Sequence, residues 1–215
     1  MRLDDLQPAL EAERITLKAT SKLTTQYGEY LLHVFEDAQT HIEHIALVLG
    51  DIAGKNNVLT RVHSECLTGD VFSSQRCDCG DQFKLAQTLI QQEEKGVIIY
   101  LRGQEGRGIG ITNKILAYGL QDGGLDTVDA NLKLNLPVDS RQYEAAAVIL
   151  KKLSIASITL LTNNPGKVSS LLSHKIVIDK IRPLQTEMNA SNQSYLYAKK
   201  LKLGHVLSIQ NNQTL

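Results

Sequence analysis

In the first eighty residues, apolar or β-branched positions alternate with polar ones, which is the period of a half-buried strand. The alternation covers the segments 14–24, 28–36, 44–50 and 57–64, and Gly28 stands where a hairpin turn would join the first two. This part of the chain is therefore predicted to be β-rich.

After residue 80 the pattern changes to helices separated by short apolar runs. A helical period covers 81–95, and VIIYL at 97–101 is a continuous apolar run, typical of a strand buried on both faces. Further segments predict helices at 113–121 and 141–153, a strand at 158–161, a helix after the turn at 163–165, a strand at 176–178 and a helix at 195–203. We expect one compact domain over 1–215, α+β or α/β in class, with a mixed sheet, a β-rich sub-region at 1–80 and an α/β sub-region at 81–215.

Composition narrows the choice of partners. The 23 lysines and arginines balance 23 acidic residues, so binding to nucleic acid or to an anionic membrane surface is not favoured, whereas a small polyanion such as a nucleotide fits a local cationic site. The N-terminus does not resemble a signal peptide, and no apolar run approaches the roughly 20 residues that span a bilayer. We expect a cytoplasmic protein with reduced thiols.

The three cysteines of the chain, Cys66, Cys77 and Cys79, fall within fourteen consecutive residues. Three soft thiolates without a fourth cysteine match a catalytic zinc site, which keeps one position for water. Arg76 favours the thiolate form of its neighbours, and Gly80 permits a tight approach to the metal. The cluster therefore predicts bound zinc, with three reduced core cysteines as the plainer alternative.

A site of three thiolates has a chemical cost. The three negative charges over-neutralise Zn²⁺, so its water is acidified less than in a site of three histidines, and neighbouring groups must help to move protons. Glu65 and Tyr118 are candidates for that role. A structural zinc closed by His63 as a fourth ligand is the other possibility.

Polar loops follow the predicted buried strands. Alternation along a strand places Arg61, His63 and Glu65 on one face beside the metal, although an exposed, solvated face explains these three by themselves. The loop RGQEGRGIG at 102–110 follows a strand and opens a helix, where glycines and Arg107 suit an anion. Ligands of open α/β units gather at such strand ends.

Two other segments allow both a functional and an ordinary interpretation. In TNNPGK at 162–167, Thr162 and Lys167 would suit a phosphate or a base edge, or the segment is a turn with a surface lysine. Asp139 precedes the helix predicted at 141–153, and by itself it is interpreted as the N-cap of that helix.

Taken together, three blocks of sequence resemble GTP cyclohydrolase II. They are RVHSECLTGDVFSSQRCDCG, YLRGQEGRGIGITNKILAYGLQDGGLDTVDAN and LLTNNPGK, in the order and spacing of that family, dense from Arg61 to Lys167 and looser outside. The resemblance implies conversion of GTP and water to formate, pyrophosphate and 2,5-diamino-6-ribosylamino-4(3H)-pyrimidinone 5′-phosphate, the first step of riboflavin biosynthesis. It also implies one catalytic Zn²⁺ per chain, Mg²⁺ on the triphosphate and a homodimer.

The resemblance also implies roles for individual residues. Zinc would be held by Cys66, Cys77 and Cys79, and Asp139, Arg141 and Tyr118 would be catalytic. GTP contacts are implied for Arg61, Val62, His63, Ser64, Glu65, Gln82, Glu105, Gly106, Arg107, Thr127, Thr162 and Lys167. The family's usual assignment makes Arg141 a nucleophile on the α-phosphorus with Asp139 as its base, but a guanidinium is always protonated, so electrostatic stabilisation is its more natural role.

The chain departs from the commonest stand-alone members at two places. An additional glycine stands in Arg102-Gly103-Gln104, and Gly123-Gly124 replaces a bulkier pair, so we expect a looser loop over the nucleotide with every candidate ligand kept. About sixty residues precede the first motif, too few for the dihydroxybutanone-phosphate synthase domain that precedes some members, so we expect a stand-alone form.

Three other functions compete with the full reaction. One is a regulatory protein that binds a nucleotide without turnover and holds a structural zinc. A second is an enzyme that opens GTP but stops at the formamide. The third, a zinc nucleoside deaminase, is disfavoured because the H-x-E and P-C-x-x-C signatures are absent from the sequence.

Overall fold

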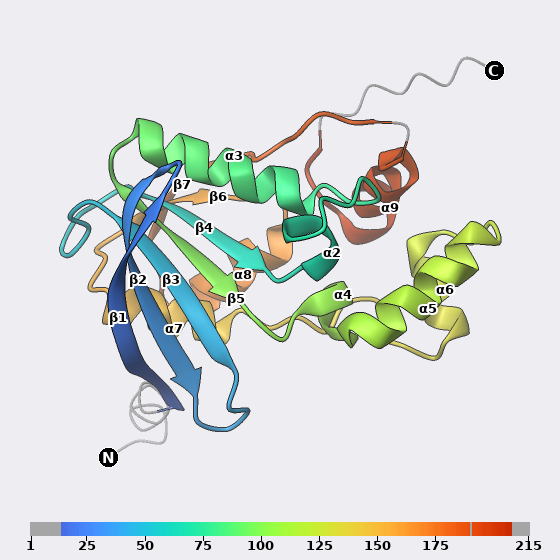
Figure 1. Cartoon of the computed structure of the whole chain (residues 1–215), viewed down its shortest axis with the longest axis horizontal. Helices are drawn as coiled ribbons and strands as arrows, with labels where there is room; N and C mark the ends of the chain where they lie inside the picture. Colours follow the sequence, from blue (N-terminus) through green and yellow to red (C-terminus); the bar gives the residue numbers. More distant parts are fainter. Residues whose placement is uncertain (1–13, 190, 208–215) are drawn as a thin grey trace.

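The computed structural model describes residues 14–189 and 191–207. The first thirteen residues, whose sequence does not resemble a signal peptide, lie outside the described residues. Within the described ranges, strands and helices alternate in the order shown in Figure 1. The strands are β1 (Ile15–Thr25), β2 (Gly28–Asp37), β3 (Glu43–Leu49), β4 (Val58–Ser64), β5 (Gly96–Leu101), β6 (Ile158–Leu161) and β7 (Ile178–Arg182). The helices are α2 (Leu67–Asp70), α3 (Cys79–Gln92), α4 (Glu105–Gly108), α5 (Gly110–Asp122), α6 (Thr127–Lys133), α7 (Glu144–Lys152), α8 (Pro165–Ser173) and α9 (Gln193–Leu203).

One mixed sheet of seven strands, in the order β1-β2-β3-β5-β4-β6-β7, organises the described residues. The first three strands form an antiparallel meander that joins β5, whereas β5, β4, β6 and β7 run parallel to one another. The mixed sheet predicted from sequence, β-rich at the start and α/β afterwards, is confirmed. Crossovers through helices separate the parallel strands, as parallel pairing requires.

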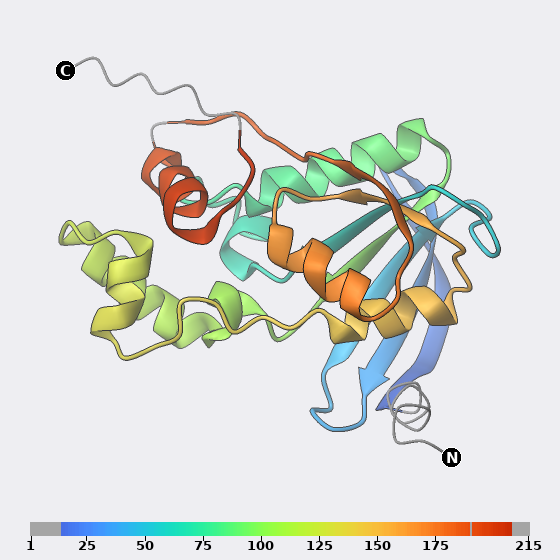
Figure 2. The same ribbon diagram turned by 180° about the vertical axis from the view of Figure 1, so that it is seen from behind.

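Helices cover both faces of the parallel half of the sheet. On one face α3 packs its Ala86 and Ile90 against a cluster that includes Ile98 and Leu161. The opposite face is covered by α7 and α8, as Figures 1 and 2 show from the two sides. Because β5 and β4 have neighbours on both faces, both strands are buried along almost their whole length, and β5 is a continuous apolar run.

The polar edge of the molecule is β1, most of whose residues are exposed. Ion pairs between Lys18 and Glu36 and between Lys22 and Glu29 join it to β2. Charged side chains on an edge strand oppose pairing with other sheets. Among the described residues, none of the helices has the length and apolar character needed to cross a bilayer.

The structure corrects several predicted boundaries. The helix predicted at 141–153 begins at Glu144, and Tyr143 is its N-cap residue, so Asp139 does not cap it. The backbone before it is held instead by an ion pair between Asp139 and Arg141. The strand expected at 176–178 is β7, at 178–182, and α6, whose sequence TVDANLK has few apolar positions, was not predicted.

Candidate active site

The carboxyl ends of β4, β5 and β6 meet at one edge of the sheet, because these strands are parallel. The segments that follow them carry the motifs at 65–66, 102–107 and 162–167. In Figure 1 the helices α4, α5 and α6 extend from this edge on one side, and α9 lies on the other. The three motifs that are far apart in the chain are therefore adjacent in space, as expected for ligand sites of open α/β sheets.

The three cysteines form one cluster. Cys66 follows β4, Cys77 lies just before α3 and Cys79 is the first residue of α3, and the three sulfur atoms lie within 4.8 Å of one another. The Sγ atoms of Cys66 and Cys77 are 3.7 Å apart. Hydrogen bonds within the cluster lower the pKa of Cys66, and the bond to Cys66 raises the pKa of Cys77 to about 11. The cluster therefore favours the thiolate form at Cys66.

Two glycines make this approach possible. A Cβ on Gly69 would lie 3.0 Å from the sulfur of Cys77 and 3.2 Å from that of Cys66, so a side chain here would press on both sulfur atoms. A Cβ on Gly80 would collide with the carbonyl oxygen of Gly69. Three convergent thiols packed around a bare backbone fit a soft metal such as zinc with three protein ligands.

His63, considered above as a fourth zinc ligand, is engaged elsewhere. Its Nε2 lies 3.0 Å from Oδ1 of Asp70, and Oδ2 of the same carboxylate accepts hydrogen bonds from the hydroxyl of Tyr100 and from the amide of Cys66. Among the described residues, the group with metal-ligand spacing consists of the three cysteines alone. The expectation of an exposed face at Arg61 and His63 is wrong, because both are buried under α3 and the loops of the site.

A buried lysine that the sequence interpretation overlooked lies beside the cluster. The Nζ of Lys114 is 3.2 Å from the sulfur of Cys66, 2.7 Å from the hydroxyl of Thr68 and 2.6 Å from Oε1 of Glu105. The other carboxylate oxygen of Glu105 accepts the amide of Leu67 at 2.5 Å. Lys114 escaped notice because a lysine in an amphipathic helix is ordinarily solvated.

Cationic side chains gather on the far side of the thiols. Arg61 donates to the Leu161 carbonyl and to Gln82, and Lys167 donates to the carbonyl of Val62 at 2.7 Å. Burial lowers the pKa of Arg61 to about 10, and burial with the charges of Arg61 and neighbouring cations lowers the pKa of Lys167 well below its usual value. Burying these cations costs solvation free energy, and a bound anion would offset that cost.

Arg107 is the clearest such cation. Its backbone is in the left-handed region, with φ at +65°, and only 8% of the residue is exposed. Neither Nη1 nor Nη2 has a hydrogen-bond partner among the described residues, while the guanidinium lies 5.6 Å from the ring centroid of Tyr195. A buried guanidinium without partners is costly, and a bidentate oxyanion such as phosphate would satisfy it.

Arg141 is held by Asp139. Its Nε and Nη2 donate to the two carboxylate oxygens of Asp139 at 2.9 and 2.5 Å. Burial would lower the pKa of Arg141, but the hydrogen bonds and charge of Asp139 outweigh it and raise that pKa. The pair therefore presents a fixed cation to the cavities that Arg141 lines.

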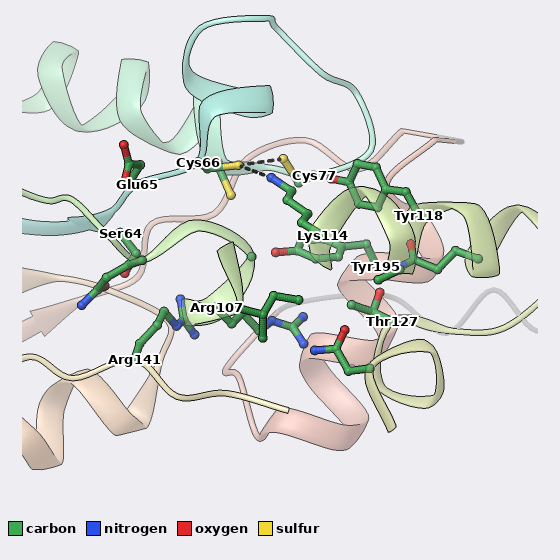
Figure 3. Close-up of a pocket in the computed structure, with 17 residues that line it drawn as sticks. Ser64, Glu65, Cys66, Cys77, Arg107, Lys114, Tyr118, Thr127, Arg141 and Tyr195 are labelled. Carbon is green, nitrogen blue, oxygen red and sulfur yellow. Dashed lines mark hydrogen bonds between the residues drawn. The ribbon is translucent and has the colours of Figure 1, made fainter. Parts of the chain in front are cut away.

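Two neighbouring cavities share a wall formed by Ser64, Cys79, Arg107, Arg141 and Tyr195. The first, with an empty volume of about 580 Å³, holds the thiols. In Figure 3 the side chains of Arg107 and Arg141 lie across this cavity from the two labelled cysteines. The second, of about 490 Å³, is cationic and is lined by residues that include Arg61, Gln82, Thr162, Lys167 and Lys199.

The predicted residues divide between these walls. Glu65, Gly106, Tyr118 and Thr127 line the thiol cavity, and His63 lines the cationic one. Burial raises the pKa of the Tyr118 hydroxyl, and the guanidinium of Arg76 lies 4.2 Å from its ring centroid. The carboxylate of Glu65 accepts the amide of Gly103 at 2.6 Å, which ties the loop with the additional glycine to the end of β4.

Three predicted residues do not line either cavity: Val62, Glu105 and Asp139. Val62 belongs to the apolar core, so its predicted contact with GTP would have to come from its backbone. The structure adds Tyr195 and Lys199 of α9 to the walls. The Nζ of Lys199 pairs with Asp78, between two of the cysteines, at 2.5 Å, a contact across 121 positions that local sequence patterns do not reveal.

The chain is similar over most of its length to known riboflavin biosynthesis proteins. GTP cyclohydrolase-2 of Pseudomonas aeruginosa PAO1 is 50% identical over 193 residues, 90% of this chain and 94% of that protein. The probable bifunctional riboflavin biosynthesis protein RIBA 2 of rice, a chloroplastic protein, is 47% identical over 195 residues, which are 91% of this chain but 35% of that protein. The chain thus spans about a third of the length of this bifunctional relative.

One solved structure is similar in part: RibBX, a two-domain 3,4-dihydroxy-2-butanone 4-phosphate synthase from A. baumannii. The match covers 85% of this chain and 50% of the RibBX chain, with a TM-score of 0.45 and 16% identity. This similarity is too low to support an argument about fold or function. The family model of GTP cyclohydrolase II matches residues 16–183, a range that includes the cysteines and the cationic cavity. On this match and on the identity to the Pseudomonas enzyme, the chain belongs to the GTP cyclohydrolase II family.

Proposed function

We propose that this chain is a zinc-dependent GTP cyclohydrolase II that converts GTP to 2,5-diamino-6-ribosylamino-4(3H)-pyrimidinone 5′-phosphate, formate and pyrophosphate. Membership of the family makes hydrolysis of GTP for riboflavin biosynthesis the activity of the chain. The observation that carries the finer proposal is the shared wall between a thiol cavity and a cationic cavity. An enzyme that hydrolyses GTP both at the base and at the triphosphate needs a metal site and a cationic site close enough for one bound GTP to reach both.

The cationic cavity is the proposed triphosphate site. Arg61, Arg107 and Lys167 are buried around it, and the free Nη atoms of Arg107 would each donate to a phosphate oxygen. We expect Mg²⁺ to arrive on the triphosphate, since phosphate oxygens are its ordinary ligands. Burial and neighbouring cations lower the pKa of Lys167, and a bound triphosphate would favour its protonated form.

We propose that Arg141 stabilises charge on the phosphoryl group and does not attack it. Its carboxylate partner Asp139 is outside the two cavities and holds the guanidinium through two hydrogen bonds. Because that partner raises the pKa of Arg141, a neutral, nucleophilic form would be rare. In this role Asp139 is a positioning residue, and its loss would misplace the cation as the pyrophosphate leaves.

In the thiol cavity Cys66, Cys77 and Cys79 would hold zinc, as their convergence and donor chemistry support. When bound, zinc would supply Lewis-acid activation of water for attack on C8 of guanine and on the resulting formamide. The hydroxyl of Tyr118 lines this cavity and is kept protonated by burial, so it would donate a hydrogen bond to the leaving nitrogen or to the formyl oxygen.

The decisive experiment follows three products from GTP and Mg²⁺, with the zinc-loaded protein and a Cys77→Ser variant. We expect formate and pyrophosphate in equal amounts from the wild type, and loss of formate in the variant. Tight GTP binding without turnover would favour the regulatory function described above. Pyrophosphate accompanied by a formamide product would show an enzyme that stops after ring opening.

Assembly and location are part of the proposal. We expect a homodimer, and the exposed apolar side chains Ile115 and Leu116 on α5, 50% and 54% exposed, offer surface for self-association. Sedimentation at micromolar concentration tests this. We also expect the protein to act in the cytoplasm, where the thiols Cys66 and Cys77 would stay reduced.

A further inference from the structure

We propose that Lys114 is a positioning residue of the metal centre, which balances the charge of the three thiolates and weakens the electron donation of Cys66. This inference rests on the proposed zinc site and goes beyond it, because Lys114 is not one of the predicted ligands or catalytic residues. Its Nζ is 3.2 Å from the sulfur of Cys66, within the range of a hydrogen bond from nitrogen to sulfur. Figure 3 shows this side chain reaching from α5 to the sulfur of Cys66.

The charge count explains why a cation is needed there. Three thiolates and Zn²⁺ carry a net charge of −1, and the buried carboxylate of Glu105 adds another. Lys114, 7% exposed, is the lysine that reaches both Cys66 and Glu105, and it offers one proton to each. Without it, two negative charges would face one another with no cation between them, which is costly for groups as buried as Cys66 and Glu105.

The contact is built into the fold. Glu105 accepts the amides of Leu67 and Gly106, so the carboxylate joins the residue after Cys66 to the glycine loop. The hydroxyl of Thr68 lies 2.7 Å from Nζ and completes the surroundings of the ammonium group. Lys114 is thereby held by three partners, Cys66 and Thr68 at the start of α2 and Glu105 at the start of α4, and its Nζ cannot leave Cys66 without straining the other contacts.

Lys114 would also offset the weak acidification of water that is expected of zinc held by three thiolates. Strong thiolate donors make zinc a poor Lewis acid, and a hydrogen bond to one sulfur withdraws electron density from it. We expect Lys114 to raise the acidity of the metal as well as its affinity. Because partners of metal ligands typically change affinity 10- to 100-fold, a Lys114→Met variant should bind zinc about 10- to 100-fold more weakly.

The test uses the full chain and two metals. Zinc affinity is measured by competition with a chromophoric chelator, and Co²⁺ replaces zinc for absorption spectroscopy. In Lys114→Met, we expect the thiolate-to-cobalt charge-transfer band to move to longer wavelength, because the sulfur of Cys66 becomes a stronger donor. Lys114→Arg should restore the band, whereas a residue that only fills space would leave the band unmoved in Lys114→Met.

Two further variants separate charge from folding. Lys84→Met removes an exposed lysine, with 58% of its side chain accessible, from the helix that carries Cys79, and should change neither affinity nor spectrum. Lys114→Met combined with Glu105→Gln removes the opposing carboxylate and should recover part of the zinc affinity. Circular dichroism of each metal-free variant checks that the fold is kept.

The outcomes distinguish this inference from the function on which it rests. If the wild type binds neither zinc nor Co²⁺, the proposed zinc enzyme and the role of Lys114 both fail. If the wild type binds both metals and a folded Lys114→Met binds them with the same affinity and the same spectrum, the role of Lys114 is overturned and the proposed enzyme stands. If Lys114→Met does not fold, an unchanged spectrum in the double variant overturns the inference as well.

Discussion

Replacing Arg107 by methionine should stabilise the free protein while weakening its binding of GTP. Methionine keeps an unbranched side chain of similar length and the same non-glycine backbone at φ +65°, so the backbone strain is unchanged. What is removed is the guanidinium of a residue that is only 8% exposed, and it has no hydrogen-bond partner at Nη1 or Nη2 among the described residues. The two effects have opposite signs because the cation is satisfied only when the anion is present.

The magnitudes follow from the contacts. A buried polar group without a partner costs about 1–3 kcal/mol, and the contact with the Tyr195 ring at 5.6 Å returns about 0.5–1 kcal/mol. A gain of about 1–2 kcal/mol in the free energy of unfolding should raise Tm by about 2–8 °C for a chain of this length. Each charge-assisted hydrogen bond to phosphate is worth about 1.5–3 kcal/mol, so GTP binding should weaken about 10- to 150-fold for each of the two contacts that Arg107 would make.

Differential scanning calorimetry of the metal-loaded protein without nucleotide gives the first quantity, and isothermal titration with a non-hydrolysable GTP analogue gives the second. Arg102→Met is the matched control, since Arg102 lies five residues earlier in the same loop and is exposed, with a pair to Glu43 at 3.4 Å. A variant of Arg107 that melts lower and binds the analogue as tightly as wild type would show that the guanidinium serves the fold and not the nucleotide.

Three further predictions follow from buried ionisable groups. Lys167, whose folded-state pKa lies below its unfolded value, should take up a proton when GTP binds, so the binding heat should depend on the ionisation enthalpy of the buffer in wild type more than in Lys167→Met. Burial lowers the pKa of His44 to about 4, so the unfolded state binds more protons between pH 4 and 6.5. Stability should therefore fall by about 3 kcal/mol on acidification through that window, and His44→Gln should flatten the profile. Lys199→Met leaves the buried Asp78 without its ion pair and should cost about 3–5 kcal/mol in the free energy of unfolding by denaturant, most of which Asp78→Asn in the same chain should restore.

Each of these has a defined contrary result. Equal buffer dependence in wild type and Lys167→Met would mean that the lysine is already charged in the free protein. For His44, the exposed His41 provides the control, and a slope shared by His41→Gln and His44→Gln would place the titrating group elsewhere. If Lys199→Met unfolds at the same denaturant concentration as wild type, the ion pair between Lys199 of α9 and Asp78 contributes nothing to stability.

Local patterns in the sequence determined the elements and the chemistry of the thiols. The alternation at 28–36 and the apolar run at 97–101 correspond to β2 and β5, because side-chain periodicity is dictated by the backbone that carries it. Cys77 and Cys79 are two residues apart, so their proximity follows from the chain itself. The motif blocks led to the family and, through it, to candidate roles that the geometry supports in Arg107 and Arg141.

Only the tertiary structure decided which of these residues face one another. Lys114 meets Cys66 across 48 positions, and Lys199 meets Asp78 across 121. Nothing local distinguishes these two lysines from solvated ones, since the cost of burying an ammonium group is offset by partners that the fold brings from elsewhere. For the same reason, the burial of Arg61 could not be derived from strand alternation. A side chain on the polar face of a strand is exposed or buried according to the helices and loops that cover it, and here α3 covers Arg61 through Gln82.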